Sequence, residues 1–82
     1  MVIVSFDPYF EKRIKKIKNK FLFEKIKKQI AKIVQYPEIG KPMKDTRKGT
    51  REVYISPFRL SYAYLKEEDK IVILDFYHKD EQ

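Results

Sequence analysis

The sequence predicts a small α+β domain with the element order β-α-α-β-β-β, in which an antiparallel sheet packs on a helical hairpin. Three observations lead to this fold class. Two stretches in the first half repeat apolar residues at helical spacing, three stretches in the second half are rich in β-branched and aromatic residues, and a basic segment separates them. With 82 residues, the chain is expected to form a single domain, 1–82, with a thin core.

The first half is predicted to be one strand followed by two helices. Residues 2–6 form a β-branched run that ends at Asp7-Pro8, where Asp can cap a helix and Pro fits its first turn. Apolar residues then recur every three or four positions among lysines and arginines. They are Phe10, Ile14 and Ile17 in one helix, and Phe23, Ile26, Ile30, Ile33 and Val34 in the next. Because Asn19-Lys20 separates the helices closely and Pro37 ends the second, an antiparallel hairpin is expected.

The second half is predicted to be a basic loop followed by a meander of three strands. In residues 37–50 the apolar period disappears, and Gly40, Pro42 and Gly49 punctuate the segment. The predicted strands are 51–55, 58–65 and 71–77, separated by Ser56-Pro57 and by the charged turn 66–70. The helical hairpin would cover one face of this sheet and leave the other open.

The composition favours a polyanionic partner. Lys and Arg number 19 against 12 Asp and Glu, which gives a net charge of +7 and favours nucleic acid. A lysine-rich surface is also typical of proteins from warm-living organisms, so this alternative stays open. The chain has no cysteine and one histidine, and it therefore has no disulfide and no ordinary zinc cage. No long apolar run or signal peptide is present, so we expect a cytoplasmic protein that does not enter membranes.

Strand parity places a candidate catalytic arginine on the open face. The bulky residues of strand 58–65 share one parity, so Arg59 is expected to point away from the helices. A guanidinium there can hold a phosphate by two hydrogen bonds and stabilise a pentacoordinate phosphorus. Alternatively, Arg59 only pairs with a nearby carboxylate such as Glu52 or Asp75.

Residues around Arg59 add further candidates. Glu52 is expected on the same open face, where it acts as a general base, neutralises Arg59 or is only solvated. Tyr54 either stacks a base or packs in the sheet. His78 is the candidate general acid, because histidine suits proton transfer near neutral pH, unless it stands idle on a frayed tail. Lys79 lies beside it, and we expect both residues to gather with Arg59 on the open face.

No pattern in the sequence predicts a metal or a cofactor. The acidic cluster at residues 67–69 lies between two strands, where a solvated hairpin turn is the simpler interpretation. The Gly40-Lys41-Pro42 segment has neither the length nor the second glycine of a phosphate-binding loop.

Several short motifs occur in a specific order over nearly the whole chain. They are F-D-P-Y-F-E-K, then G-K-P-M-K, K-G-T-R-E-V, P-F-R-L-S-Y and I-L-D-F-Y-H-K. In this order and spacing the chain resembles the RelE/ParE superfamily of toxins from type II toxin-antitoxin modules, and specifically its RelE branch. The resemblance implies a RelE-like fold and a ribosome-dependent endoribonuclease that cleaves mRNA in the A site. It also implies a cognate antitoxin that neutralises the toxin in a hetero-oligomer.

The resemblance also assigns roles to particular residues. The arginine that contacts the scissile phosphate falls on Arg59, and the basic position after the last strand falls on Lys79, with His78 beside it. Some relatives pair a strand glutamate with a C-terminal histidine, which implicates Glu52 and His78. The basic residues that hold the message fall on Lys44, Arg47, Lys48 and Arg51.

The implied reaction needs no metal: the ribose 2′-hydroxyl attacks the adjacent phosphate and expels the 5′-oxygen. Glu52 and Tyr54 stand where many relatives carry lysine or arginine, so two alternatives stay open. One is a ParE-type toxin that inhibits DNA gyrase without nuclease activity. The other is an inactive member that binds only RNA or its antitoxin.

Overall fold

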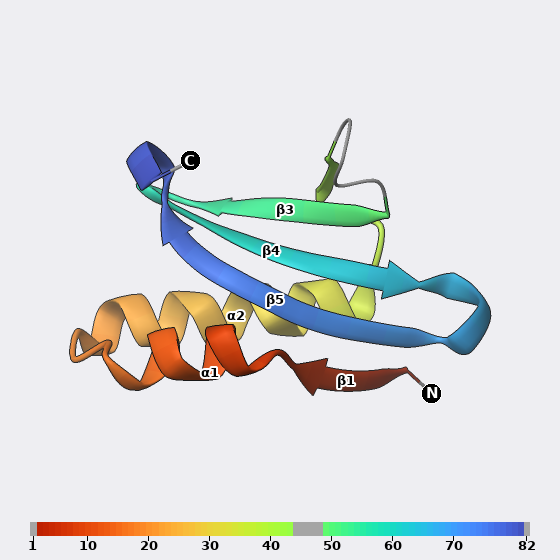
Figure 1. The fold of residues 1–82 in the computed structure, drawn as a ribbon, viewed down its shortest axis with the longest axis horizontal. Coiled ribbons are helices and arrows are strands. Elements are labelled where there is room, and N and C mark those ends of the chain that lie inside the picture. The colour runs from red at the N-terminus through yellow and green to blue at the C-terminus, as the bar shows by residue number, and fades with distance from the viewer. Residues whose placement is uncertain (1, 44–48, 82) are drawn as a thin grey trace.

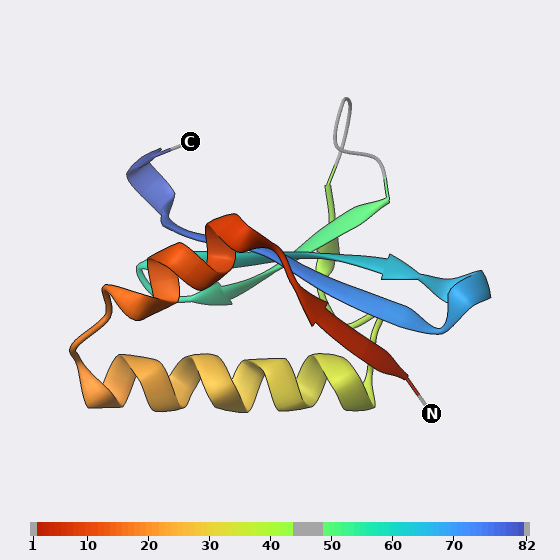
Figure 2. The same cartoon turned by 60° about the horizontal axis from the view of Figure 1, so that its bottom comes forward.

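Two helices pack against one face of a five-stranded mixed sheet in the computed structural model of the chain (Figures 1 and 2). The structure describes residues 2–43 and 49–81. The helices and strands are β1 (Ile3–Phe6), α1 (Pro8–Lys15), α2 (Lys20–Gln35), β2 (Lys41–Pro42), β3 (Thr50–Ile55), β4 (Phe58–Leu65) and β5 (Lys70–His78). Short 3-10 turns, η2 (Lys66–Glu68) and η3 (Lys79–Glu81), precede and follow β5. No helix within the described ranges is long and apolar enough to cross a membrane.

Side-chain caps start both helices where the sequence predicts them. The Asp7 carboxylate accepts a hydrogen bond from the backbone N–H of Tyr9 at 2.9 Å, and Pro8 occupies the first turn of α1. The Asn19 side chain accepts from the backbone N–H of Phe21 at 2.9 Å. Asn19 has an extended backbone, as N-cap residues do, so α1 and α2 are not one continuous helix. Ile17 therefore lies in the connection rather than in α1, although it still packs against the core.

The sheet has the order β1-β5-β4-β3-β2. β3, β4 and β5 form the predicted antiparallel meander, but β1 pairs with β5 in parallel, from Ile3 opposite Lys70 to Phe6 opposite Ile73. The sheet is thus mixed rather than purely antiparallel. Apolar patterning specifies which face of a strand is buried, and it carries no information on the direction of a neighbour far away in the sequence. The short strand β2 was also not predicted; it lies in the expected loop and pairs with β3 at Glu52 and Arg51.

The core lies between the helices and the facing side of β3, β4 and β5. Phe10 of α1 and Ile26 and Ile33 of α2 are buried. They pack with sheet residues that share one face, namely Ile55, Leu60, Tyr62, Ile71, Ile73 and Phe76. This cluster confirms the expectation that the helical stripe and the bulky residues of β4 meet, and it leaves the alternate residues of each strand on the opposite side.

A β-bulge in β5 changes which of its residues face the core. Ser61 of β4 lies opposite Asp75, but the next residue, Tyr62, lies opposite Ile73, so Leu74 has no partner on β4. Because of this extra residue, Ile73 and Phe76 both face the helices although they are three positions apart. The alternation of side chains is therefore reversed between the first and the last part of β5.

The turn between α2 and β2 is fixed to the sheet by Tyr62. The Tyr62 hydroxyl donates a hydrogen bond to the carbonyl of Pro37 and accepts one from the backbone N–H of Gly40, both at 2.8 Å. Burial raises the pKa of the Tyr62 hydroxyl above its usual value of 10.0. A Cβ at Gly40 would lie only 2.6 Å from the Tyr62 hydroxyl, so the close approach requires glycine. The guanidinium of Arg51 also donates to the carbonyls of Glu38 and Gly40.

Candidate functional site

Arg59 lies on the sheet face that points away from the helices. It is opposite Tyr54 of β3 and Tyr77 of β5, while its neighbour Leu60 is fully buried under the helices. Strand parity predicts this orientation correctly. The β-bulge brings Tyr77 to the same face, because it reverses the alternation after Ile73.

Glu52 joins Arg59 and Tyr77 in one hydrogen-bonded group on this open face. Nη1 of Arg59 lies 3.3 Å from Oε1 of Glu52, and the Tyr77 hydroxyl donates to Oε2 of Glu52 at 3.0 Å. The side chains of Arg59 and Glu52 are 30% and 15% exposed, so both are sheltered but reachable from solvent. The interpretation that Arg59 pairs with a nearby carboxylate is confirmed for Glu52; the other candidate, Asp75, forms an ion pair with Arg13 of α1 at 2.9 Å.

This group has the chemical parts of a phosphate-handling site. A guanidinium carries five N–H donors in a planar fork, so Arg59 can contact Glu52 and a phosphate oxygen with different N–H groups. A carboxylate held by two donors keeps a fixed orientation, and Glu52 can accept a proton from a hydroxyl placed beside it. Among the described residues, no group of three histidine, aspartate or glutamate side chains is arranged to hold a metal ion.

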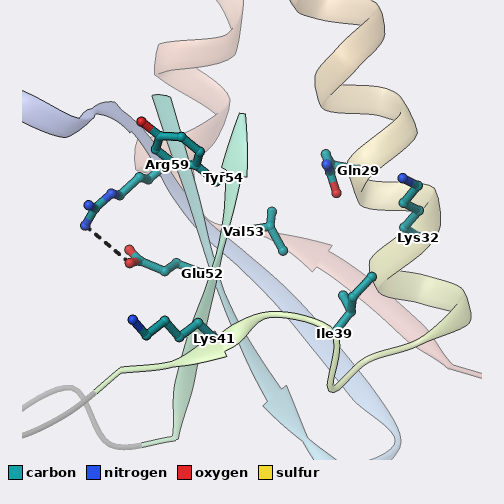
Figure 3. Close-up of a pocket in the computed structure, with 8 residues that line it drawn as sticks. All are labelled: Gln29, Lys32, Ile39, Lys41, Glu52, Val53, Tyr54 and Arg59. Carbon is teal, nitrogen blue, oxygen red and sulfur yellow. Dashed lines mark hydrogen bonds and ion pairs between the residues drawn. The ribbon is translucent and has the colours of Figure 1, made fainter. Parts of the chain in front are cut away.

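A pocket of about 460 Å³ adjoins Arg59 and Glu52 at the outer edge of β3. We call it the β3-edge pocket (Figure 3). Its lining residues come from α2, the turn after α2, β2, β3 and β4, and they are Gln29, Lys32, Ile39, Lys41, Glu52, Val53, Tyr54 and Arg59. In Figure 3, Arg59, Glu52, Tyr54 and Lys41 lie on one side of β3, and Gln29, Lys32 and Ile39 lie on the other. The pocket therefore extends around the strand edge.

The two other residues of β3 that the sequence predicts for the site, Tyr54 and Arg51, occupy different environments. Tyr54 is 52% exposed and lines the β3-edge pocket beside Arg59, where its ring can be reached by a ligand. Arg51 shares the parity of Val53 on β3 rather than that of Glu52, and its guanidinium donates to the carbonyls of Glu38 and Gly40. Arg51 thus supports the turn after α2, and contact with RNA stays a prediction for this residue.

His78 is not brought together with Arg59. It is the last residue of β5 and lies opposite Phe58, and the two rings meet edge to face with centroids 5.5 Å apart. Its side chain lines a separate cavity of about 410 Å³ with residues of α1 such as Tyr9 and Lys12. The expected gathering of His78 with Arg59 on one face is therefore not found, because the β-bulge turns His78 toward the helix side.

The remaining predicted residues give less information about the site. Lys79 is exposed in the turn η3, where its backbone N–H donates to the carbonyl of Pro57 at 3.1 Å. The positions Lys44, Arg47 and Lys48 lie outside the described residues. Sequence reasoning missed Tyr77 because its partner is set by strand register, and it missed Gln29 and Lys32 because nothing in a helical pattern indicates which sheet edge a polar residue adjoins.

Comparisons with known proteins identify relatives of this fold. A family model described as the ParE toxin of the type II toxin-antitoxin system, parDE, matches residues 4–82. The sequence comparison with curated proteins gives no match.

Several solved structures are similar over nearly the full length. One chain of the intact E. coli RelBE toxin-antitoxin complex matches with a TM-score of 0.81 and 18% identity, covering 95% of this chain and 96% of that chain. A RelBE-type toxin-antitoxin complex from Mycobacterium tuberculosis gives 0.80 and 23%, covering 95% and 98%. A YoeB/ParE toxin from Agrobacterium tumefaciens gives 0.83 and 13%, covering 94% and 98%. The RelE-like fold expected from the sequence motifs is confirmed.

Proposed function

The chain belongs to the ParE toxin family of type II toxin-antitoxin systems, within the RelE/ParE superfamily, and from this premise we propose that it is a ribosome-dependent endoribonuclease that cleaves mRNA in the A site. The observation that carries the proposal is the group formed by Arg59, Glu52 and Tyr77 on the open sheet face. The net charge of +7 favours approach of a polyanion to such a surface.

In the proposed reaction, Glu52 takes the proton of the ribose 2′-hydroxyl, and the resulting oxygen attacks the adjacent phosphorus. Arg59 stabilises the extra negative charge that develops on the non-bridging oxygens. The 5′-oxygen then leaves with a proton, and a 2′,3′-cyclic phosphate remains on the upstream fragment. Tyr77 holds Glu52 through Oε2, which keeps the carboxylate aimed while Arg59 engages the phosphate.

His78 and Lys79 stay the predicted source of the proton for the leaving oxygen. Since the His78 side chain lies on the helix side, we expect its loss to reduce cleavage less than the loss of Arg59. In a ribosome-dependent reaction the ribosome positions the message, and such positioning can lower the barrier without further groups from the toxin.

We also propose that a cognate antitoxin binds this toxin in a hetero-oligomer in the cytoplasm. Two of the similar structures are described as RelBE toxin-antitoxin complexes, which supports a partner of this kind. A strongly basic toxin surface favours an acidic antitoxin segment that covers the site until the antitoxin is removed.

The proposal is tested by adding the purified protein to a reconstituted translation reaction with a defined message. Cleavage within the A-site codon is expected for the wild type and a loss of about 100- to 1,000-fold for Arg59→Ala, the range for removal of one electrostatic stabiliser. Lys25→Ala, on the exposed side of α2, is the charge-matched control and should cleave at the wild-type rate. The nuclease proposal is lost if the wild type cuts no message, or if Arg59→Ala cuts as well as the control.

The description of the matching family model favours a second candidate, a ParE-type toxin that inhibits DNA gyrase without cleaving RNA. A supercoiling assay with purified gyrase separates the two. Inhibition of supercoiling together with intact mRNA in the translation reaction would establish this second function in place of the first.

A further inference from the structure

The outer edge of β3 is only partly covered in the described part of the chain. β2 pairs with β3 only at Arg51 and Glu52, and among the described residues no strand pairs with the outer side of residues 53–55. The β3-edge pocket lies at this edge and includes Arg59 and Glu52 in its lining (Figure 3). Its volume of about 460 Å³ lies within the usual range for small-molecule sites.

The charge of the pocket lining suits a phosphate group. Lys32, Lys41 and Arg59 carry positive charge, and Glu52 is the single acid in the lining. Glu52 is already engaged by Arg59 and Tyr77. Within residues 2–43 and 49–81, neither lysine forms an ion pair with a carboxylate; Lys41 lies directly opposite Glu52, and the lining as a whole carries a net positive charge.

The uncharged part of the lining suits a nucleobase. Tyr54 presents an exposed aromatic ring, and Ile39 and Val53 provide apolar surface across the strand edge. Gln29 of α2 is half-buried and offers both an amide donor and a carbonyl acceptor. Unstacked RNA bases are recognised by this combination of an aromatic or apolar surface and a hydrogen-bonding edge.

We propose that the β3-edge pocket binds the nucleotide that adjoins the cleaved linkage, with Gln29 contacting the base edge and Lys32 contacting a phosphate. The proposal rests on the endoribonuclease function proposed above and extends it, because it assigns base selection to α2. The message would cross the edge of β3 from the open face toward α2, so that the cleaved linkage stays at Arg59 and the neighbouring nucleotide lies against Gln29.

An extended peptide could also use an open strand edge, by adding a strand to β3. The pocket favours RNA over this occupant for two reasons. Arg59 and Glu52 are part of its lining, and the three basic residues of the lining against one acid suit the passage of a phosphate chain.

The test uses the full chain in the ribosome-dependent reaction with messages that carry all A-site codons, and sequencing reads the cleavage positions. Gln29→Leu keeps the side-chain size and removes the amide, so the base preference at one codon position should weaken by about fivefold, the value of one hydrogen bond.

Lys32→Ala should raise KM several-fold with kcat unchanged and lower the slope of log KM against log salt by about one. Lys28→Ala is the matched control, because Lys28 is exposed one turn earlier on α2 and does not line the pocket.

A second measurement separates this proposal from the nuclease function. Nucleoside 3′-monophosphates are titrated into the labelled protein while NMR follows the side-chain amide of Gln29. A shift that Lys32→Ala abolishes and Lys28→Ala retains is expected, even if the wild type proves unable to cleave RNA. If the wild type cleaves but Gln29→Leu matches Lys28→Ala in codon preference, and Lys32→Ala matches it in KM and in the titration, the pocket proposal is overturned and the nuclease function stands. If Gln29→Leu and Lys32→Ala cleave like the wild type but bind the antitoxin more weakly, the pocket proposal is also overturned, and the outer edge of β3 is assigned to a peptide of the antitoxin.

Discussion

Replacement of Tyr62 by phenylalanine tests how the turn beside the candidate site is held. The substitution keeps the aromatic ring, which is fully buried, and removes only the hydroxyl. That hydroxyl satisfies two backbone groups at once, the carbonyl of Pro37 and the N–H of Gly40, each at 2.8 Å. After the change, Gly40 is left with a buried donor and no acceptor.

The expected cost follows from these two groups. A buried donor that loses its acceptor costs about 1–3 kcal/mol, and a partly buried carbonyl that loses one donor costs about 0.5–1.5 kcal/mol. The free energy of unfolding should therefore fall by about 1.5–4.5 kcal/mol. A folded chain of 82 residues has a total stability of roughly 4–12 kcal/mol, so this loss is a large share of it.

Urea denaturation followed by circular dichroism measures the effect, and an unchanged m-value would show that the unfolded state is not altered. Tyr64→Phe is the control, because Tyr64 lies on the same face of β4 and, among the described residues, its hydroxyl forms no hydrogen bond. The control should change stability by less than about 0.5 kcal/mol. If Tyr62→Phe costs no more than this control, the view that the Tyr62 hydroxyl fixes the turn is refuted.

Four further predictions concern the same residues and the site. Because burial raises the pKa of Tyr62, the unfolded chain ionises first, and the stability advantage of wild type over Tyr62→Phe should be full below pH 10 and shrink as pH rises through the folded pKa; urea midpoints across that range measure this. Gly40→Ala should destabilise the fold by about 1–3 kcal/mol, because its Cβ would collide with Tyr62, and thermal melting checks it. Tyr77→Phe should lower kcat for message cleavage about tenfold, because Glu52 loses a donor worth about 1.5 kcal/mol; an unchanged kcat would contradict the positioning role. Affinity for ribosome-free RNA should fall steeply with salt, and a flat log-log plot would exclude phosphate contacts.

Local signals predicted the parts of the fold that depend on neighbours in sequence. The caps Asp7 and Asn19 and the apolar spacing of both helices are such signals, and all of them operate within a few residues. The orientation of Arg59 follows from simple alternation along β4, which is regular. For this reason the sequence predicted the open face and its arginine.

The parts that escaped prediction depend on pairings between distant segments. The parallel pairing of β1 with β5 joins residues more than sixty positions apart. The side of the sheet on which Tyr77 and His78 lie depends on the β-bulge between Ile73 and these residues. No residue pattern in β5 indicates this bulge. Alternation from Ile71 and Ile73 without the bulge would have put His78 beside Arg59 and Tyr77 under the helices, the reverse of what the structure has.

The extra residue in β5 also bears on how such toxins can diverge. Deleting Leu74 would restore regular pleating and leave Tyr77 opposite Arg59 and His78 opposite Phe58, so the phenol and the imidazole would keep their present sides of the strand. A single codon gained or lost at this point therefore changes the length of β5 without changing which side chains meet Arg59. Members of the superfamily can differ in strand length by this route without any change in the chemistry of the open face.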